Sequence, residues 1–376
     1  MSRLIVLTAL LLIWPTIITS TAQDEANTAF ETTIFERLSV YAGPGDTYEV
    51  VGILGSGVPV SVDERNPIGT WLHINRPATD TTEAVSGWVL SGYLNLPEDL
   101  DISTLPTTDL PPADLDAIEN DDLRRLYTTP TIPTLSDAMI TVFERGQDDD
   151  NQADVVSKIG DSNTANPRYL EPLGQGQVEL GAYRYLQPAV DYFGPGFDKA
   201  DNATRVGLNT FSVFDPFWSN PTRCEPDEYP LQCEFRVNKP ALAVIMFGQN
   251  DTRVLNTEQW EEQMRRIIEE TLAANVIPAL VTFSSADNAD VYQQTITFNL
   301  ILLDLADEYE VPVINLWAAA RALPNRGIGA DDAHLTGGGD VMAFTGREAR
   351  DGVVLLNLLV LATLEDFRQT LPINPD

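Results

Sequence analysis

Hydrophobic and polar positions follow two different rhythms along this chain, and the change of rhythm divides it into two regions. Between residues 35 and 96, short apolar runs are separated by turns rich in glycine, proline and aspartate. Runs of strand length at this spacing predict a small all-β barrel, which we place at residues 30–96. From residue 154 onward, apolar runs of strand length alternate with longer segments in which apolar residues recur every three to four positions. This second rhythm predicts strands that alternate with amphipathic helices.

The second region has the pattern of a parallel sheet. Its strand-length apolar runs are residues 155–159, 241–247, 277–283 and 311–316. Its helical segments are residues 136–145, 257–272, 289–308 and 350–369. Ser136 is placed to cap the first helix, and Asn256 and Gln259 have the spacing of a capping box at the second. Strands and helices that alternate in this way predict a three-layer α/β domain, in which helices cover both faces of a parallel sheet.

The segment between the two regions has a composition of its own. Residues 97–133 are rich in proline, threonine and aspartate and show little hydrophobic periodicity. This composition predicts an extended, acidic linker. We therefore expect a β domain at 30–96, a linker at 97–133 and an α/β domain at 134–376. The acidic run at 148–151 lacks the ligand spacing of an EF-hand, so we interpret it as a solvated loop.

The N-terminus has the pattern of an export signal. One basic residue, Arg3, precedes an apolar run, and small residues up to Ala22 precede an acidic stretch. This pattern predicts a signal peptide at residues 1–22, with no stable membrane span after its cleavage. An uncleaved anchor is the alternative, although Pro15 interrupts the apolar run. We thus expect a secreted protein, located outside the cell or in the cell envelope.

Composition excludes several kinds of partner. The chain of 376 residues carries 56 acidic side chains against 23 lysine and arginine side chains, a formal net charge of −33. This charge repels nucleic acid and anionic membrane surfaces. Two histidines and two cysteines are too few for a histidine-rich metal centre, a structural zinc site or a disulfide scaffold. In an oxidising compartment, Cys224 and Cys233 are expected to form one disulfide that stabilises the fold by roughly 2.5 to 3 kcal/mol.

Chemically active side chains follow two of the predicted strands. Ser162 lies in a turn directly after the first strand, and Asn250 lies directly after the second. Because the carboxyl ends of parallel strands meet at one edge of the sheet, we expect these side chains to lie close together there. His334, the only histidine of this region, lies between the last strand and the C-terminal helix.

These residue types suit nucleophilic catalysis. A serine hydroxyl needs a base within hydrogen-bond reach, and an imidazole, which ordinarily titrates near pH 6.5, can serve as that base. Here the base is His334. Asp331 can hold the other imidazole nitrogen, with Asp332 as the alternative. The side-chain amide of Asn250 and the backbone N–H of Ser162 can stabilise an oxyanion.

Four short blocks of this region resemble, in their usual order, the blocks of the SGNH (GDSL) hydrolase superfamily. The blocks are Gly160-Asp161-Ser162, Gly207, Gly248-Gln249-Asn250-Asp251 and Asp331-Asp332-Ala333-His334. The resemblance implies an α/β sandwich that hydrolyses esters and needs no metal or organic cofactor. It implies a catalytic triad of Ser162, Asp331 and His334. It also implies oxyanion-hole donors on Ser162, Gly207 and Asn250.

Two features of the resemblance leave alternatives open. The second block is little more than a glycine, so Gly194 and Gly196 are alternatives to Gly207. The stretch between Gly207 and Gly248 departs from the family, because it is long, rich in aromatic residues and contains both cysteines. Its aromatic side chains could line an acyl or sugar pocket, or pack on the outside of the sheet.

The N-terminal region resembles the bacterial SH3-like domains of cell-envelope proteins. The resemblance rests on residues 38–45, 50–52, 71–74, 87–89 and 93–94. Such domains often bind peptidoglycan or other wall polymers, so the resemblance implies a targeting module, and a spacer that binds nothing is the alternative. His73 lies in an alternating strand pattern, and we interpret it as a structural residue rather than a ligand.

The sequence as a whole predicts a secreted serine esterase of the SGNH type. Its expected substrate is an ester on a carbohydrate or cell-envelope polymer, such as an acetylated glycan. The alternatives are a lipase or aryl esterase that acts on small esters, a non-catalytic wall-binding protein, and an inactive member of the family. Activity is expected to fall below about pH 6, because an ordinary imidazole becomes protonated there.

Overall fold

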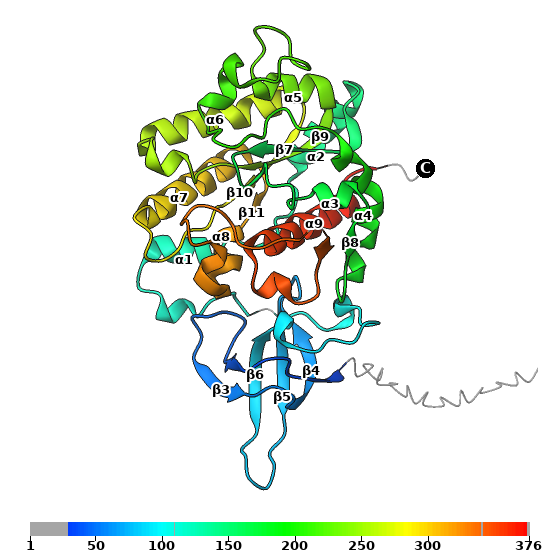
Figure 1. Cartoon of the computed structure of the whole chain (residues 1–376), viewed down its shortest axis with the longest axis vertical. Helices are drawn as coiled ribbons and strands as arrows, with labels where there is room; N and C mark the ends of the chain where they lie inside the picture. The colour runs from blue at the N-terminus through cyan, green and yellow to red at the C-terminus, as the bar shows by residue number, and fades with distance from the viewer. Residues whose placement is uncertain (1–28, 109, 340, 374–376) are drawn as a thin grey trace, which may run out of the picture.

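The computed structural model describes residues 29–108, 110–339 and 341–373. The predicted signal peptide, residues 1–22, lies outside the described residues. Figure 1 shows a small β domain, drawn in blue at the bottom, beneath a larger α/β domain. The segment between them runs along the junction of the two domains.

The β domain is one antiparallel sheet with the strand order β1-β4-β5-β6-β2-β3. Its strands are Phe30–Thr33 (β1), Leu38–Tyr41 (β2), Val50–Leu54 (β3), Pro59–Arg65 (β4), Trp71–Arg76 (β5) and Val85–Leu90 (β6). Alternate side chains of β4 and β5, among them Val60, Val62, Leu72 and Ile74, are buried in its core. This sheet confirms the predicted all-β region and is compatible with an SH3-like domain.

The segment at residues 97–133 is not the extended chain that its composition predicted. It contains a short helix, Asp121–Thr128 (α1), whose Leu126 is fully buried. Ile102 and Leu105 are also buried, and the N–H of Ile102 donates to the carbonyl of Ala182 at 2.8 Å. These apolar side chains lack a regular period, but they are buried against the folded domains, with α1 packed on α7 (Tyr292–Tyr309) and α8 (Leu316–Ala319), and this burial orders the segment.

The α/β domain is built on a four-stranded sheet in the order β11-β10-β9-β7. Every neighbouring pair in this sheet is parallel. The strands are Gln152–Gly160 (β7), Pro240–Met246 (β9), Ile277–Val281 (β10) and Val313–Ile314 (β11). The parallel sheet confirms the predicted fold class and brings the carboxyl ends of all four strands to one edge.

Helices cover the sheet on two sides, as Figure 1 shows: α6 and α7 lie on one side, and α4 and α9 lie on the other. The helices of this domain are Asp137–Asp148 (α2), Glu171–Gly174 (α3), Gln187–Phe193 (α4), Pro230–Asn238 (α5), Thr257–Ala273 (α6), Tyr292–Tyr309 (α7), Leu316–Ala319 (α8) and Gly352–Thr370 (α9). Ser136 caps α2 by accepting from the N–H of Met139, as predicted. Asn256 and Gln259 form the predicted capping box of α6.

The last strand of the sheet is much shorter than its apolar run predicted. The run at 311–316 forms only the two-residue strand β11, and α8 begins directly after Asn315. The Asn315 side chain accepts from the N–H of Ala318 and donates to the carbonyls of Leu126 and Thr129. A buried polar side chain with these partners ends the strand, because it caps a helix instead of continuing the ladder.

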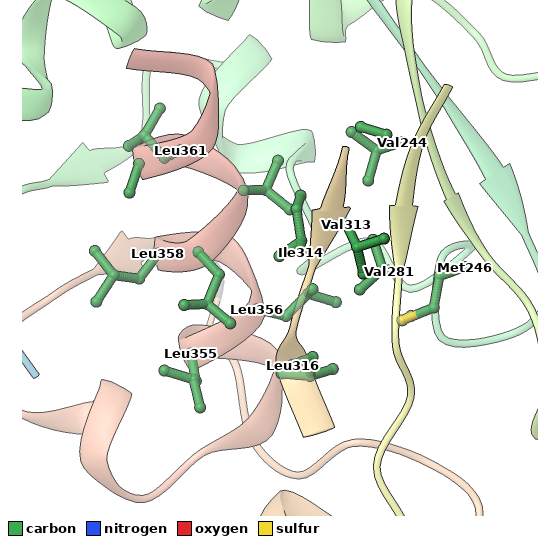
Figure 2. Packing of buried hydrophobic residues seen from close by; sticks show 14 of the residues in the cluster. Val244, Met246, Val281, Val313, Ile314, Leu316, Leu355, Leu356, Leu358 and Leu361 are labelled. Atoms are coloured by element: carbon green, nitrogen blue, oxygen red, sulfur yellow. The ribbon is translucent and has the colours of Figure 1, made fainter. Parts of the chain in front are cut away.

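The core of the domain lies between the sheet and α9. In Figure 2, Leu356 of α9 points toward Ile314 and Leu316, while Leu355 and Leu358 extend from the other side of the helix. All five side chains are buried. A helix that is apolar on more than one face is a core helix, and α9 therefore fixes the C-terminal end of the loop that precedes it.

No helix within residues 29–108, 110–339 and 341–373 combines the length and the apolar character that a membrane-spanning helix needs.

Candidate active site

Ser162 lies in a tight turn at the carboxyl end of β7. A Cβ at Gly160, the last residue of the strand, would collide with the carbonyl oxygen of Met246 on β9. The Asp161 carboxylate accepts from the N–H of Asn163 at 2.9 Å, and its carbonyl accepts from the N–H of Ala165 at 2.9 Å. These local bonds turn the chain sharply. Ser162 is partly exposed, while its neighbours Asp161 and Asn163 are buried.

His334 lies on a hairpin that returns to the same edge of the sheet. Ile328 and Leu335 pair as an antiparallel bridge, and the N–H of Gly329 donates to the carbonyl of His334 at 2.8 Å. The Asn163 side chain accepts from the N–H of Leu335 at 2.9 Å and donates to the carbonyl of Ala333 at 3.2 Å. The residue after Ser162 thus fastens the hairpin to the serine turn.

The hairpin brings three predicted side chains together. The Ser162 Oγ lies 2.9 Å from the His334 Nε2, and the His334 Nδ1 lies 2.5 Å from the Asp331 Oδ2. The other Asp331 oxygen accepts from the N–H of His334 at 3.0 Å. The bond from the His334 N–H, together with the bond from its side chain, lowers the pKa of Asp331 to about 2. The carboxylate in contact with the imidazole is that of Asp331, not that of the alternative Asp332.

The predicted oxyanion donors Asn250 and Gly207 lie on two loops that are bonded to each other. The Asn250 side-chain amide follows β9 and donates to the carbonyl of Leu208 at 2.9 Å. Gly207, directly before Leu208, has a φ of +84°, which favours glycine. Asp251 accepts from the N–H of Thr210 at 3.0 Å and from its hydroxyl at 2.6 Å. These bonds join the Gly207 loop to the Asn250 turn.

The two alternatives to Gly207 lie elsewhere. Gly194 and Gly196 belong to a buried 3-10 helix at Gly194–Asp198. A Cβ at Gly196 would lie 2.7 Å from the carbonyl oxygen of Asp154, near the amino end of β7. Ser162 follows the opposite end of that strand, whereas Gly207 lies on a loop that is bonded to the Asn250 turn.

Residues 159–340 match the family model of the GDSL-like Lipase/Acylhydrolase family, and the match spans every block of the site. These residues form a GDSL-like lipase/acylhydrolase domain. It is a serine ester hydrolase domain. No curated protein matches the chain.

Solved structures with a similar arrangement include three esterases or lipases. A lipase/acylhydrolase from Enterococcus faecalis is 19% identical, covers 59% of this chain and 98% of its own, and has a TM-score of 0.38. An acetyl xylan esterase from Geobacillus stearothermophilus is 17% identical, covers 56% and 93%, and has a TM-score of 0.36. A psychrotrophic esterase from Pseudoalteromonas sp. is 13% identical, covers 57% and 99%, and has a TM-score of 0.36.

Two carboxyl groups, those of Asp161 and Asp251, are buried in the turns that follow β7 and β9 of the GDSL-like domain. Burial raises the pKa of Asp161 to about 7, and the neighbouring charge of Asp251 adds to this rise. Burial also raises the pKa of Asp251, against the bonds that it accepts from Thr210. Because both pKa values are raised, the state in which Asp161 and Asp251 are both ionised is disfavoured near neutral pH.

The sequence left open whether the aromatic stretch lines a pocket or packs on the outside of the sheet. Different residues of the stretch do each of these. Trp218 lies near the site, because a Cβ at Gly207 would be 3.6 Å from its ring. Phe214 and Tyr229 instead pack around the guanidinium of Arg266 on α6, 3.7 Å and 5.7 Å from the ring centres. One part of the stretch thus borders the site and another covers the outside of the domain.

The two cysteines form the predicted disulfide. Among the described residues, Cys224, Glu228 and Cys233 form a cluster of side chains with the spacing of metal ligands. Both sulfurs are consumed in the disulfide, and Glu228 pairs with Arg236 at 2.7 Å. This cluster therefore does not fit a metal ion.

The β domain holds a second serine-histidine-carboxylate contact that the sequence did not reveal. The Ser86 Oγ lies 3.1 Å from the His73 Nε2, and the His73 Nδ1 lies 2.7 Å from the Asp63 Oδ1. These residues come from β6, β5 and β4, and only the strand register brings them together. Ser86 lies within a strand that pairs along its length with β5, so its surroundings differ from the open turn at Ser162.

Proposed function

We propose that this protein is a secreted esterase that cleaves ester bonds through a covalent acyl-enzyme on Ser162. The contact that supports this proposal is the 2.9 Å separation between the Ser162 Oγ and the His334 Nε2, with Asp331 on the far imidazole nitrogen. His334 and Asp331 are each about half exposed, so a bulky substrate can reach the serine from solvent.

In the first half of the reaction, His334 takes the proton of Ser162 while the Oγ attacks the ester carbonyl carbon. The oxyanion that forms accepts hydrogen bonds from the N–H groups of Ser162 and Gly207 and from the Asn250 amide. The intermediate collapses when the bond to the alcohol oxygen breaks, and His334 gives its proton to that oxygen. Asp331 stabilises the imidazolium throughout.

In the second half, His334 takes a proton from water, and the resulting hydroxide oxygen attacks the acyl carbon. The bond between that carbon and the Ser162 Oγ breaks, and the proton returns to Ser162. The acid leaves, and the enzyme is restored without a metal or an organic cofactor in any step.

The proposed substrate is an O-acyl group on a carbohydrate or cell-envelope polymer, for example an acetylated glycan. Two features support this choice: the export signal of the sequence, and a β domain compatible with wall-associated SH3-like modules. The β domain is then the part of the protein that binds peptidoglycan or another wall polymer.

A lipase or aryl esterase is a second candidate, and one observation favours it. Val206, Phe211 and Val254 lie within four residues of Gly207 or Asn250, and their exposed fractions are 71%, 48% and 60%. Exposed apolar side chains beside a nucleophile can hold an acyl chain. Faster cleavage of octanoyl than of acetyl esters would select this candidate.

The experiment compares the mature protein with its Ser162→Ala and Ser86→Ala variants. Hydrolysis of p-nitrophenyl acetate and covalent labelling by a fluorophosphonate are measured on all three. Ser86 is the matched control, because it is the other serine that contacts a histidine backed by a carboxylate. We expect Ser162→Ala to abolish labelling and lower kcat by at least about 10⁴-fold, and Ser86→Ala to change neither.

Three results would contradict the proposal. Labelling that survives in Ser162→Ala but disappears in Ser86→Ala would move the nucleophile to the β domain. Turnover without Ser162 would exclude an acyl-enzyme on this residue. A folded wild type that neither turns over nor labels would favour a non-catalytic binding protein.

A further inference from the structure

The β domain touches the α/β domain on both sides of the segment that carries Asp331 and His334. One contact lies at Arg326, directly before the hairpin, and the other lies at Gly346 and Arg350, directly before α9. Figure 1 shows this C-terminal segment, in orange to red, reaching down to the top of the β domain. The two ends of the segment are therefore held by a different domain from the one that supplies Ser162.

The first contact is an ion pair across 280 positions of sequence. The Asp46 Oδ2 lies 2.5 Å from the Arg326 Nη1, and both side chains are mostly buried, at 21% and 27% exposure. The loop around Asp46 is itself held, because the Thr47 hydroxyl accepts from the N–H of Asp114 at 2.7 Å and Tyr48 donates to the carbonyl of Pro111 at 3.0 Å. Asp46 is thus a fixed partner for Arg326.

Arg326 connects Asp46 to residues at the carboxyl edge of the sheet through further hydrogen bonds and ion pairs. Its guanidinium also pairs with Asp287, 2.8 Å away, which in turn pairs with the buried Arg321 at 2.8 Å. Its carbonyl accepts from the Ser284 hydroxyl at 2.7 Å, and the carbonyl of Ser284 accepts from the Gln249 side chain. Gln249 directly precedes Asn250, so the same network reaches the candidate oxyanion donor.

The backbone at Arg326 is strained. Asn325 and Arg326 have φ values of +47° and +56°, a region that costs non-glycine residues roughly 1 kcal/mol or more each. Gly327 follows, and its carbonyl accepts from the N–H of Thr336 at 2.8 Å, which closes the base of the hairpin. Backbone bonds hold this turn, from the N–H of Arg326 to the carbonyl of Leu323 and from the N–H of Ile328 to the carbonyl of Asn325, each at 3.0 Å. The ion pairs of Arg326 with Asp46 and Asp287 add side-chain contacts that favour the same conformation.

The second contact holds the far end of the segment. A Cβ at Gly92 in the β domain would collide with the carbonyl of Gly346, so the two backbones touch. Arg350 pairs with Glu36 at 3.1 Å, and its guanidinium lies 4.8 Å from the ring centre of Tyr93. This contact orders the chain between the hairpin and α9 from the side of the β domain.

We propose that the β domain is a structural part of the active site, and that Asp46 is a positioning residue that holds the Asp331–His334 hairpin in place through Arg326. This inference rests on the proposed function and deepens it. The β domain then has a role in catalysis that does not depend on whether it binds a wall polymer.

The test uses the full mature chain and three variants at two positions. Asp46→Ala removes the carboxylate, and Asp46→Glu keeps it. Asp80→Ala is the matched control, because Asp80 is an exposed carboxylate in the β5–β6 loop, which Figure 1 shows pointing away from the α/β domain. Sites competent for chemistry are counted by fluorophosphonate titration, and kcat is expressed for each labelled site.

If Asp46 positions the hairpin, kcat per labelled site and the labelling rate should both fall by about fivefold or more in Asp46→Ala, because a misplacement near 1 Å can cost up to 10²-fold. KM should change less than about twofold, since Asp46 does not touch substrate. Asp46→Glu should recover most of the loss, and Asp80→Ala should equal wild type. A kcat per labelled site that falls by less than about fivefold overturns the proposal, even if fewer sites are folded.

A second measurement does not depend on turnover. The N–H groups of Gly329 and Thr336 donate within the hairpin, to the carbonyls of His334 and Gly327. In Asp46→Ala these two amides should exchange with deuterium faster than in wild type, while amides of α9 keep their rates. Unchanged exchange at both amides would overturn the proposal. A wild type that is inert with unreactive Ser162 would instead contradict the proposed function, so the two failures are distinguishable.

Discussion

The side-chain amide of Asn250 donates to the carbonyl of Leu208 at 2.9 Å, and Leu208 is the residue directly after Gly207. One amide hydrogen therefore joins the loop that carries Gly207 to the turn that carries Asn250. The same bond fixes the rotation of the amide. In the mechanism proposed above Asn250 therefore has two tasks, since it donates to the oxyanion and also holds the Gly207 loop against the Asn250 turn.

Asn250→Ala should lower kcat by about 10²- to 10³-fold, because it removes one preorganised oxyanion donor. The change should leave Ser162, His334 and Asp331 in contact, so stoichiometric labelling by a fluorophosphonate should survive at a lower rate. Steady-state kinetics with p-nitrophenyl acetate measure the effect, and a thermal melt checks the fold. A kcat within about threefold of wild type would show that Asn250 gives no donor to the transition state.

Asp331 should stay ionised over the whole working range of pH. Its pKa of about 2 lies below the ordinary value of 3.8, because it accepts from the His334 N–H and side chain. A carboxyl with a lowered pKa contributes stability above its unfolded value, near pH 4, and loses it only as the pH falls through about 2. Any loss of activity between pH 8 and pH 5 therefore does not come from protonation of Asp331.

Asp331→Asn should lower kcat by about 10⁴-fold, because an amide has one oxygen and cannot accept both from the imidazole Nδ1–H and from the backbone N–H of His334, so the wrong tautomer is favoured. Asp332→Asn is the matched control. Asp332 has a φ of +56°, which asparagine also tolerates, so the backbone should not change. If Asp332→Asn loses as much activity as Asp331→Asn, then Asp331 alone does not orient His334, and this prediction is wrong.

Much of the active-site geometry could be predicted because it follows from one rule of parallel sheets. Ser162 and Asn250 end neighbouring strands, so their proximity needs only the strand assignment and the sheet direction. The helix caps Ser136 and Asn256 could also be predicted, because a cap is recognised from residues only three positions apart. The choice of Gly207 over Gly194 and Gly196 stays a prediction, and it depends on positions in the fold that no local pattern specifies.

The features that the sequence did not reveal all depend on distant pairs. The contact between Ser86 and His73 requires the register of β5 and β6, which no local pattern fixes. The ion pair of Asp46 with Arg326 joins two loops of different domains, and each loop taken alone looks like an ordinary polar turn. Residues 97–133 are ordered by isolated buried side chains such as Ile102, whose burial depends on the surfaces around it.

The disulfide between Cys224 and Cys233 should stabilise the fold without taking part in catalysis. The two cysteines are nine positions apart, so the bond closes a small loop, and its loss should cost about 2.5 to 3 kcal/mol on the chain-entropy model. For a domain of this size that corresponds to about 5 to 10 °C in Tm. The double variant Cys224→Ser, Cys233→Ser should show this loss in a thermal melt.

The kcat of the double variant should stay within about twofold of wild type, because α5 has a second attachment to the sheet. Glu234, directly after Cys233, is fully buried and accepts from the Asn202 N–H at 2.6 Å and from the Ser157 hydroxyl on β7. These bonds remain when the disulfide is absent. A large fall in kcat at a temperature where the double variant is folded would show that the loop closed by the disulfide shapes the site, through Trp218 beside Gly207.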